Sequence, residues 1–149
     1  MKIRHIAQPV RAALFLAAFL APVVTDTALA REPSPAGAEA YIVSPKDGAK
    51  INGPVTVVFG LKGMGIAPAG VKFDNTGHHH LLVDTDAPTD LSLPLPADEH
   101  NLHFGKGQTE TTLTLSPGKH TLQLVFADFL HTPHVPAVIS KKVTISVEK

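Results

Sequence analysis

Short runs of alternating hydrophobic and polar residues recur from Tyr41 to the end of the chain, and they are rich in β-branched side chains. Gly and Pro separate these runs, and no window after residue 30 shows the i, i+3, i+4 apolar spacing of an amphipathic helix. We therefore expect strands at residues 41–43, 54–60, 78–84, 108–115, 119–128 and 143–147. The Pro-containing loop after the third of these leaves room for one short edge strand.

Six or seven short strands without a helix to cover a parallel sheet favour an all-β fold, an antiparallel immunoglobulin-like β-sandwich over residues 41–149. In that fold the third strand pairs antiparallel with the fifth. The segment Ser116-Pro117-Gly118-Lys119 has Pro and Gly where a type II turn needs them, which predicts a tight hairpin between the fourth and fifth strands. A Pro-rich bend at 129–136 is then expected to lead into the last strand.

The first thirty residues have the pattern of a cleaved signal peptide. Lys2, Arg4 and Arg11 precede an apolar run at residues 12–24, and Ala28-Leu29-Ala30 supplies the small-x-small pattern of a cleavage site. The apolar run is shorter than the roughly twenty residues that span a bilayer. We expect a signal peptide at 1–30 and a periplasmic or secreted protein that does not associate with a membrane after cleavage.

Composition narrows the range of partners and chemistries. Residues 31–40 are mostly Pro, Ser, Ala, Gly and Glu without periodicity, which predicts a flexible leader. The chain has 13 Lys plus Arg and 13 Asp plus Glu, and proteins that bind nucleic acid through its phosphates normally carry a basic excess, so no nucleic-acid partner is expected. The absence of Cys excludes thiolate metal sites, iron–sulfur clusters and Cys nucleophiles.

Four sequence blocks carry a resemblance to a known family. They are GHHHLLVD at 77–84, HFGKGQTET at 103–111, LSPGKHTLQL at 115–124 and HTPHVPAVIS at 131–140. In this order they resemble the signature blocks of the small secreted bacterial proteins called domain of unknown function 4399. The resemblance covers roughly residues 44–147 and implies an immunoglobulin-like secreted domain, but it implies no particular activity.

Histidine is the unusual component of this neutral chain, since eight of its nine histidines follow residue 30. The expected strand pairing brings all of these except His120 to one pole of the domain. Alternation along a strand puts His78 and His80 on one face and His79 on the other. His120 begins the fifth strand, about 26 Å from the end of that strand at Asp128.

Two imidazoles at i and i+2 on a strand can reach a single metal ion at about 2.0–2.1 Å. The predicted ligands at the histidine pole are His78, His80, His100, His103, His131 and His134. Without a thiolate, the site suits Cu(II) or Zn(II), with copper preferred over zinc, while the thioether of Met64 would favour Cu(I). Because imidazole coordinates only when neutral, affinity is expected to fall below about pH 6.

The alternative is a secreted immunoglobulin-like interaction module that binds a periplasmic protein partner, with structural histidines and no metal. For three residues the structural role is preferred: His120 pins the neighbouring turn, Asp128 forms a turn before the bend, and Met64 is an apolar plug. No GxSxG frame and no pair of acidic residues is found, so we expect a binding protein and not an enzyme.

Overall fold

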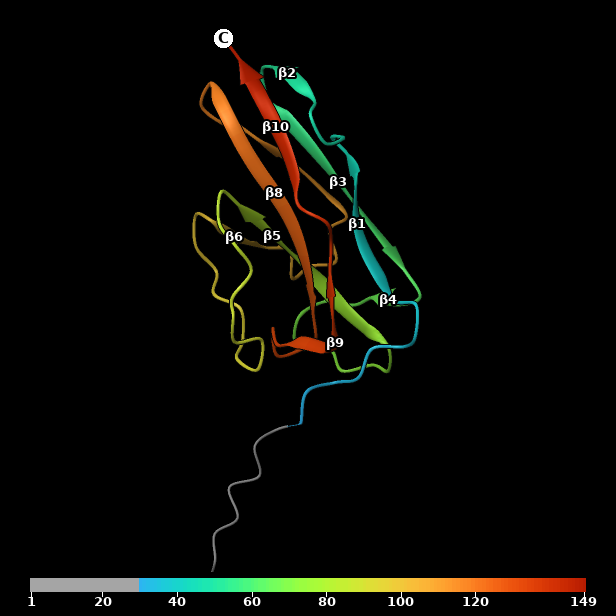
Figure 1. Ribbon diagram of the computed structural model, residues 1–149. Coiled ribbons are helices and arrows are strands. Elements are labelled where there is room, and N and C mark those ends of the chain that lie inside the picture. The colour runs from blue at the N-terminus through green and yellow to red at the C-terminus, as the bar shows by residue number, and fades with distance from the viewer. Residues whose placement is uncertain (1–29) are drawn as a thin grey trace, which may run out of the picture.

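The computed structural model describes residues 30–149, which form two packed β-sheets (Figure 1). The strands are β1 (Glu39–Ser44), β2 (Lys50–Asn52), β3 (Val55–Lys62), β4 (Gly65–Ile66), β5 (Thr76–Val83), β6 (Asn101–His103), β7 (Glu110–Leu113), β8 (Gly118–Ala127), β9 (Pro133–Ile139) and β10 (Val143–Glu148). The predicted signal peptide falls outside the described residues except for Ala30. Within residues 30–149, no helix is long and apolar enough to cross a membrane.

One sheet has the order β1-β3-β7, and the other has the order β2-β10-β8-β5-β4, with β6 beside β5 and β9 beside β8. Within these sheets β1–β3, β3–β7, β5–β8 and β8–β10 are antiparallel pairs. The sheet of β1, β3 and β7 thus lies opposite the sheet that contains β5, β8 and β10, as in immunoglobulin-like sandwiches. The predicted fold class is confirmed, and so are the antiparallel pairing of β5 with β8 and the short edge strand, β6.

The predicted hairpin between residues 108–115 and 119–128 is wrong. β7 pairs with β3 in the smaller sheet, and residues 114–117 carry the chain across to β8 in the larger one. Leu113 and Leu115 pack against the core from the β3 side. Alternation shows only that β7 has one apolar face, and this face meets the core from either sheet, so the pattern does not select the partner strand.

The chain reverses after β8 earlier than predicted. β9 begins at Pro133, inside the expected bend, and pairs antiparallel with the last part of β8. The sequence did not predict β9 because this strand contains Pro133 and Pro136. Pro cannot donate to a ladder and is confined to strand starts and edges. On its other side, Pro33 forms a parallel bridge with Val135.

The segment expected to be a flexible leader is therefore tied to the domain. Arg31 donates from Nε to the Pro133 carbonyl at 2.8 Å and from Nη2 to the His134 carbonyl at 2.6 Å. Backbone hydrogen bonds also join Val135 to Glu32 and Ser34. β1 begins at Glu39, inside the predicted leader. The Pro and Gly content that suggested a lack of structure is compatible with this edge because few of its backbone groups need ladder partners.

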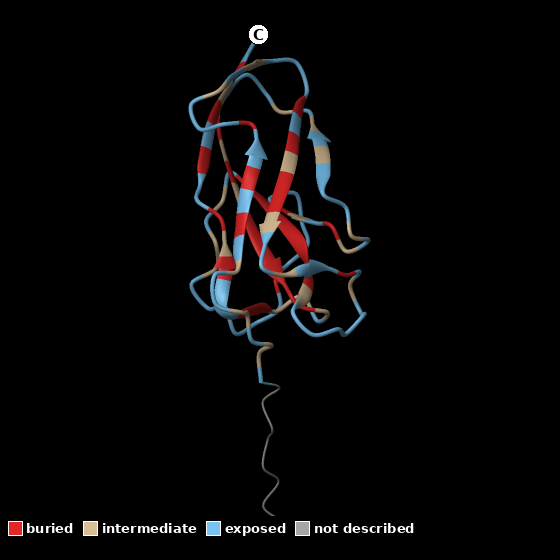
Figure 2. Ribbon diagram, turned by 90° about the vertical axis from the view of Figure 1, so that its right-hand side faces the viewer, coloured by how far each residue is buried: buried red, intermediate tan, exposed pale blue. Residues whose placement is uncertain are grey.

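The main core lies between the two sheets and contains alternate residues of β3, β5 and β8. Figure 2 shows the buried residues of the domain in red. A second, smaller core lies on the outer face of the larger sheet, where Leu82, Val125 and Ala127 pack against Leu95 from the long loop after β5. Because the main core covers the inner face of β5 and this second core lies on the outer face, every residue from Gly77 to Val83 is buried. The outward face of β5 is consequently sheltered at the position where the histidines lie.

Candidate metal centre

Strand register assembles three histidines on the outer face of the larger sheet. His78 and His80 share this face of β5 because successive side chains of a strand point to opposite sides. His103 of β6 is the direct cross-strand partner of His80. Side chains of directly opposed residues have Cβ atoms about 4.5–5.5 Å apart, so the pairing alone brings a third imidazole to the first two.

The ring nitrogens of these histidines converge. Nε2 of His78 and Nε2 of His80 lie 3.1 Å apart. One ligand nitrogen from each of His78, His80 and His103 can be chosen so that all three lie within 4.8 Å of one another. Two nitrogens bound to one ion at about 2.0–2.1 Å, with an angle of about 90–109° between them, are about 2.8–3.4 Å apart. The His78–His80 separation therefore suits a shared ion.

His131 adds a fourth imidazole from the turn between β8 and β9. Its ring centroid lies 4.7 Å from that of His103, 5.1 Å from that of His78 and 6.0 Å from that of His80. We call His78, His80, His103 and His131 the histidine cluster. Its first two members are buried and His103 is exposed, so the cluster opens to solvent on the His103 side.

Two of the predicted ligands lie elsewhere. His100 is exposed and its Nδ1 contacts the Val83 carbonyl at 2.9 Å, five residues along β5 from His78, a span of about 16 Å. Its placement at the same pole was wrong because it depended on the hairpin that does not form. His134 is buried on the core side of the sheet, where its ring stacks on Phe126 at 5.8 Å.

Burial controls the protonation of the cluster. Desolvation, followed by the neighbouring imidazoles, lowers the pKa of His78 to about 4 and that of His80 to about 3. The pKa of His103 is also lowered, chiefly by desolvation and then by His131. Protons thus compete for the two buried ligands well below the value of about pH 6 that was expected for ordinary imidazoles.

His79 points the other way, as alternation predicted. It is fully buried in the main core, with its ring 5.2 Å from Phe59 and 5.1 Å from Phe126. Within residues 30–149 neither ring nitrogen has a hydrogen-bond partner, and desolvation lowers the pKa of His79 to about 4. A neutral imidazole in this position acts as a flat core side chain. Because it lies on the opposite face of β5, it does not join the histidine cluster.

Met64 and Asp128 adopt the structural roles preferred from the sequence. Met64 is partly buried and packs against the main core, as the predicted apolar plug. Asp128 is 4% exposed, and its Oδ1 accepts hydrogen bonds from the backbone N–H groups of Leu130 and Thr132 at 2.8 and 2.9 Å. It therefore forms the turn that carries His131, as an acceptor for backbone groups.

Comparison with family models gives a match over residues 57–148 to the family described as a domain of unknown function (DUF4399). The chain belongs to this family. The matched segment contains β5, β6 and the whole histidine cluster. Comparison with curated proteins found no match.

Among solved structures, the chain is similar to one described as "Structures of Clostridium thermocellum CbhA fibronectin(III)-like modules". The two share 10% sequence identity with a TM-score of 0.34. The similarity covers 73% of this chain and 93% of the other.

His120 lies at the far end of β8 and fastens two loops. Its Nε2 contacts the Ser116 carbonyl at 2.8 Å, as predicted, and its Nδ1 lies 2.7 Å from Oδ2 of Asp84. The hydrogen bond that His120 donates to the Asp84 carboxylate raises the pKa of His120. When the ring is protonated, both nitrogens donate, one to each oxygen. Asp84, at the end of β5, was not identified from the sequence as the partner.

We expect His120→Ala to lower the free energy of unfolding by about 2 kcal/mol at pH 6, because it removes one hydrogen bond to a charged group and one to a carbonyl. Since the native pKa is raised, this stabilisation is fully present below the unfolded pKa of about 6.5 and is lost as pH rises through the native value. Urea unfolding of both proteins at pH 6 and pH 9 measures it. An equal cost at the two pH values would contradict the ion pair.

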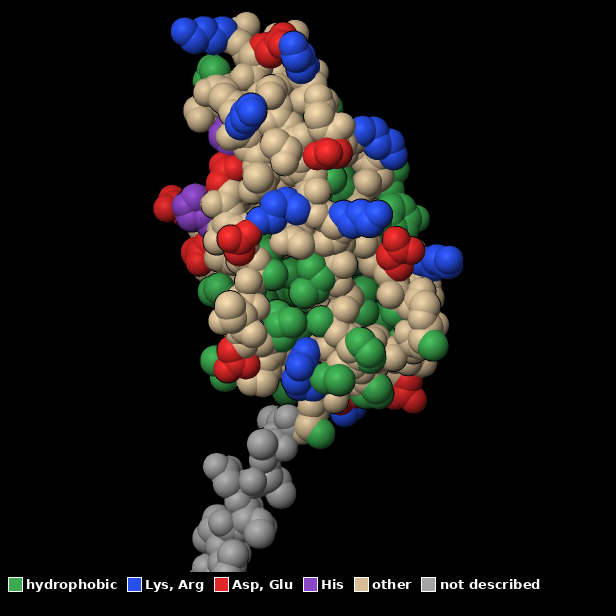
Figure 3. Space-filling model, viewed as in Figure 1, with side chains coloured by type: hydrophobic (Ala, Val, Ile, Leu, Met, Phe, Trp, Pro, Cys, Tyr) green, Lys and Arg blue, Asp and Glu red, His purple; other side chains and the backbone are tan. Residues whose placement is uncertain are grey.

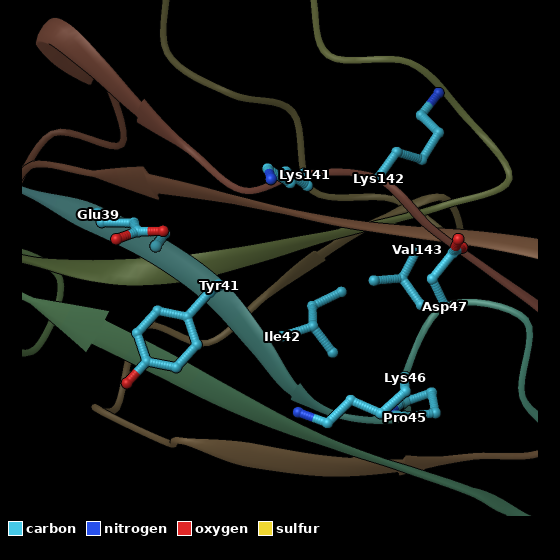
Figure 4. A pocket seen from close by; sticks show the side chains of 10 residues that line it. Glu39, Tyr41, Ile42, Pro45, Lys46, Asp47, Lys141, Lys142 and Val143 are labelled. Atoms are coloured by element: carbon cyan, nitrogen blue, oxygen red, sulfur yellow. The ribbon is translucent and has the colours of Figure 1, made fainter.

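A separate surface hollow lies between β1, with the segment that follows it, and the start of β10 (Figure 4). It is lined by Glu39, Ala40, Tyr41, Ile42, Pro45, Lys46, Asp47, Lys141, Lys142 and Val143. None of these is a histidine, and the lining mixes cationic, anionic and apolar side chains. The hollow offers no set of soft or imidazole ligands, so the histidine cluster is the candidate metal centre.

Proposed function

We propose that this domain binds a transition-metal ion through His78, His80 and His103, with His131 as a fourth ligand. The observation that carries the proposal is the 3.1 Å separation of the two buried Nε2 atoms, together with the convergence of one ring nitrogen from each of His78, His80 and His103 to within 4.8 Å of one another. A contraction of less than about 2 Å, available to the exposed His103 side chain, would bring three nitrogens to one ion at normal bond lengths.

The proposed ion is copper in preference to zinc. The cluster offers imidazole nitrogens, and Cu(II) binds nitrogen sites more tightly than Zn(II) does. The thioether that would have favoured Cu(I) belongs to Met64, which packs against the core. Low pKa values keep the two buried imidazoles neutral at neutral pH, so their lone pairs are available without proton release.

We also propose that the domain acts outside the cytoplasm and without catalysis, by binding, delivering or sequestering the ion. The signal-like pattern of residues 1–30 supports export. The exposed edge at His103 provides a side from which an ion can enter or leave, while the other side of the cluster is enclosed by the sheet and the second core.

The direct test is calorimetric titration of the domain beginning at Arg31 with Cu(II), Cu(I) and Zn(II) at pH 7.5. We expect one tight site, with Cu(II) bound more tightly than Zn(II), and a spectrum of the bound Cu(II) that shows nitrogen ligands. The absence of tight binding by all three ions would overturn the proposal.

A second candidate function is binding of a protein partner at the same end of the domain. Phe73 is 72% exposed and Leu93 is 59% exposed. Backbone hydrogen bonds place their loops beside the cluster, from Gly70 to Phe129 and from Leu95 to His131. Hydrophobic side chains also gather over the lower half of the face in Figure 3. A partner that binds the metal-free protein as tightly as the loaded one would favour this function.

A further inference from the structure

The turn between β8 and β9 presents His131 in an uncommon backbone conformation. His131 has φ of 68°, in the left-handed region that few residues other than Gly adopt, although Asn, Asp and His adopt it more often than other side chains do. Such a conformation costs roughly 1–3 kcal/mol and persists only where surrounding contacts impose it. Something in this turn must therefore hold His131 in place.

Hydrogen bonds to Asp128 surround His131 on both sides in sequence. The carboxylate Oδ1 accepts from the N–H groups of Leu130 and Thr132, the residues directly before and after His131. The backbone of Asp128 completes the closure, since its carbonyl accepts from the His131 N–H at 3.0 Å and its N–H donates to the Thr132 carbonyl at 2.9 Å. Asp128 is buried, so water does not readily replace these bonds.

The other end of the turn is tied to the second core. The carbonyl of His131 accepts from the N–H of Leu95 at 2.9 Å, and Leu95 is buried against Leu82 and Val125. The backbone of His131 is thereby fixed relative to β5 and β8. Its ring is the one that packs on His103 and His78 from above the sheet.

We propose that Asp128 is a positioning residue of the metal centre, which acts by holding His131 in the left-handed conformation that brings its imidazole to the other three. This rests on the proposed function for the role of the metal, and the turn itself is independent of it. What matters is an acceptor oxygen at the right distance from the backbone, as in an Asx turn, and not the negative charge.

Four variants separate the effect of the acceptor oxygen of Asp128 from the effect of its negative charge. Asp128→Asn keeps the acceptor oxygen and removes the charge. Asp128→Glu keeps the charge and moves the oxygen one methylene further out. Asp128→Ala removes both. His131→Asn removes the imidazole and retains a side chain that tolerates positive φ. Asp47→Ala is the matched control, because Asp47 also accepts from a backbone N–H, that of Thr144 on β10, outside this turn.

Each variant is titrated with Cu(II) in the full domain and examined by electron paramagnetic resonance. We expect Asp128→Ala and Asp128→Glu to reproduce the spectrum of His131→Asn, with affinity lowered about tenfold. Asp128→Asn and Asp47→Ala should keep the wild-type spectrum and an affinity within about threefold of it. A wild-type spectrum for Asp128→Ala, or a His131→Asn spectrum for Asp128→Asn, would overturn the positioning role.

A second measurement uses the metal-free protein, so that failure of the proposed metal binding can be distinguished from failure of the positioning role of Asp128. The amide protons of Leu130 and Thr132 should exchange faster in Asp128→Ala and Asp128→Glu, and the ring protons of His131 should shift toward free-histidine values. In Asp128→Asn they should stay near wild type. If wild-type protein binds no Cu(II), the proposed function fails, whereas unchanged His131 ring shifts in Asp128→Ala overturn the positioning role.

Discussion

Replacing His80 by Ala is expected to lower the affinity of the domain for Cu(II) at least tenfold, and by more than the loss of any other single histidine. His80 is fully buried, faces the His78 Nε2 at 3.1 Å and is the cross-strand partner of His103, so it lies between two other proposed ligands. Changes outside the ligand shell of a metal commonly cost 10–100-fold in affinity, and loss of a ligand should cost no less. Calorimetric titration at pH 7.5 measures the difference.

Neighbouring histidines supply the controls. His79→Ala removes an imidazole next in sequence but on the opposite face, and His100→Ala removes one near the other end of β5. Both should keep affinity within about threefold of wild type, as should His120→Ala. His131→Ala should lower affinity about tenfold. Retained affinity in His80→Ala together with lost affinity in His100→Ala would show that the cluster is not the site.

Gly105→Ala tests the same geometry without removing a ligand. A Cβ at Gly105 would overlap Cε1 and Nε2 of the His103 ring, and its backbone conformation is one that Ala adopts. The exposed ring would rotate away from His78 and His80, and affinity should fall severalfold while the melting temperature changes little. Unchanged affinity would show that His103 is not a ligand.

The second large effect is loss of stability in acid. Burial lowers the native pKa values of His78 and His79 to about 4 and that of His80 to about 3. In the unfolded chain these histidines bind protons near pH 6.5, whereas in the native protein they stay neutral until the pH is much lower. Their contribution to stability is complete above about pH 6.5 and falls as pH drops toward 3. Each pKa unit corresponds to about 1.4 kcal/mol, and screening by solvent reduces this value. We therefore expect the free energy of unfolding to fall by several kcal/mol in total.

Urea unfolding of the metal-free domain at pH 7, 5 and 4 measures this loss, with His79→Leu as the matched variant. Leu removes a buried ring whose nitrogens have no hydrogen-bond partner in the described part of the chain, and it leaves the cluster intact. It should be as stable as wild type or more so at pH 7, and should lose less stability at pH 4. Identical acid profiles for the two proteins would mean that His79 is protonated normally in the fold.

The alternation of hydrophobic and polar residues, with Gly and Pro between the runs, was enough to predict the fold class and most of the long strands. They also placed His78 and His80 on one face of β5 and His79 on the other, because a strand has only two faces and a period of two residues. The turn-forming role of Asp128 and the contact of His120 with the Ser116 carbonyl followed from local chemistry in the same way. These features depend on residues close together in sequence.

Apart from the β5–β8 pair, strand pairing was decided only by the tertiary structure. The placement of β7 beside β3, of β6 beside β5 and of residues 31–35 beside β9 depends on contacts between distant segments. Periodicity fixes which side of a strand is apolar, but not which strand lies next to it. His103 joins His80 through the β5–β6 register, whereas His100 and His134 are separated from the cluster by the same packing.

Burial was the other property that only packing decided. His78 and His80 lie on the outward face of a sheet, where the sequence pattern implies contact with water and an ordinary pKa. The second core around Leu82, Val125 and Leu95 covers that face beside them. Desolvation then lowers both pKa values, because burial penalises the charged imidazolium more than the neutral ring. The sequence determines where the histidines stand along the chain. The packing of the long loop over the sheet contributes to the burial that lowers the pKa of His78 and His80.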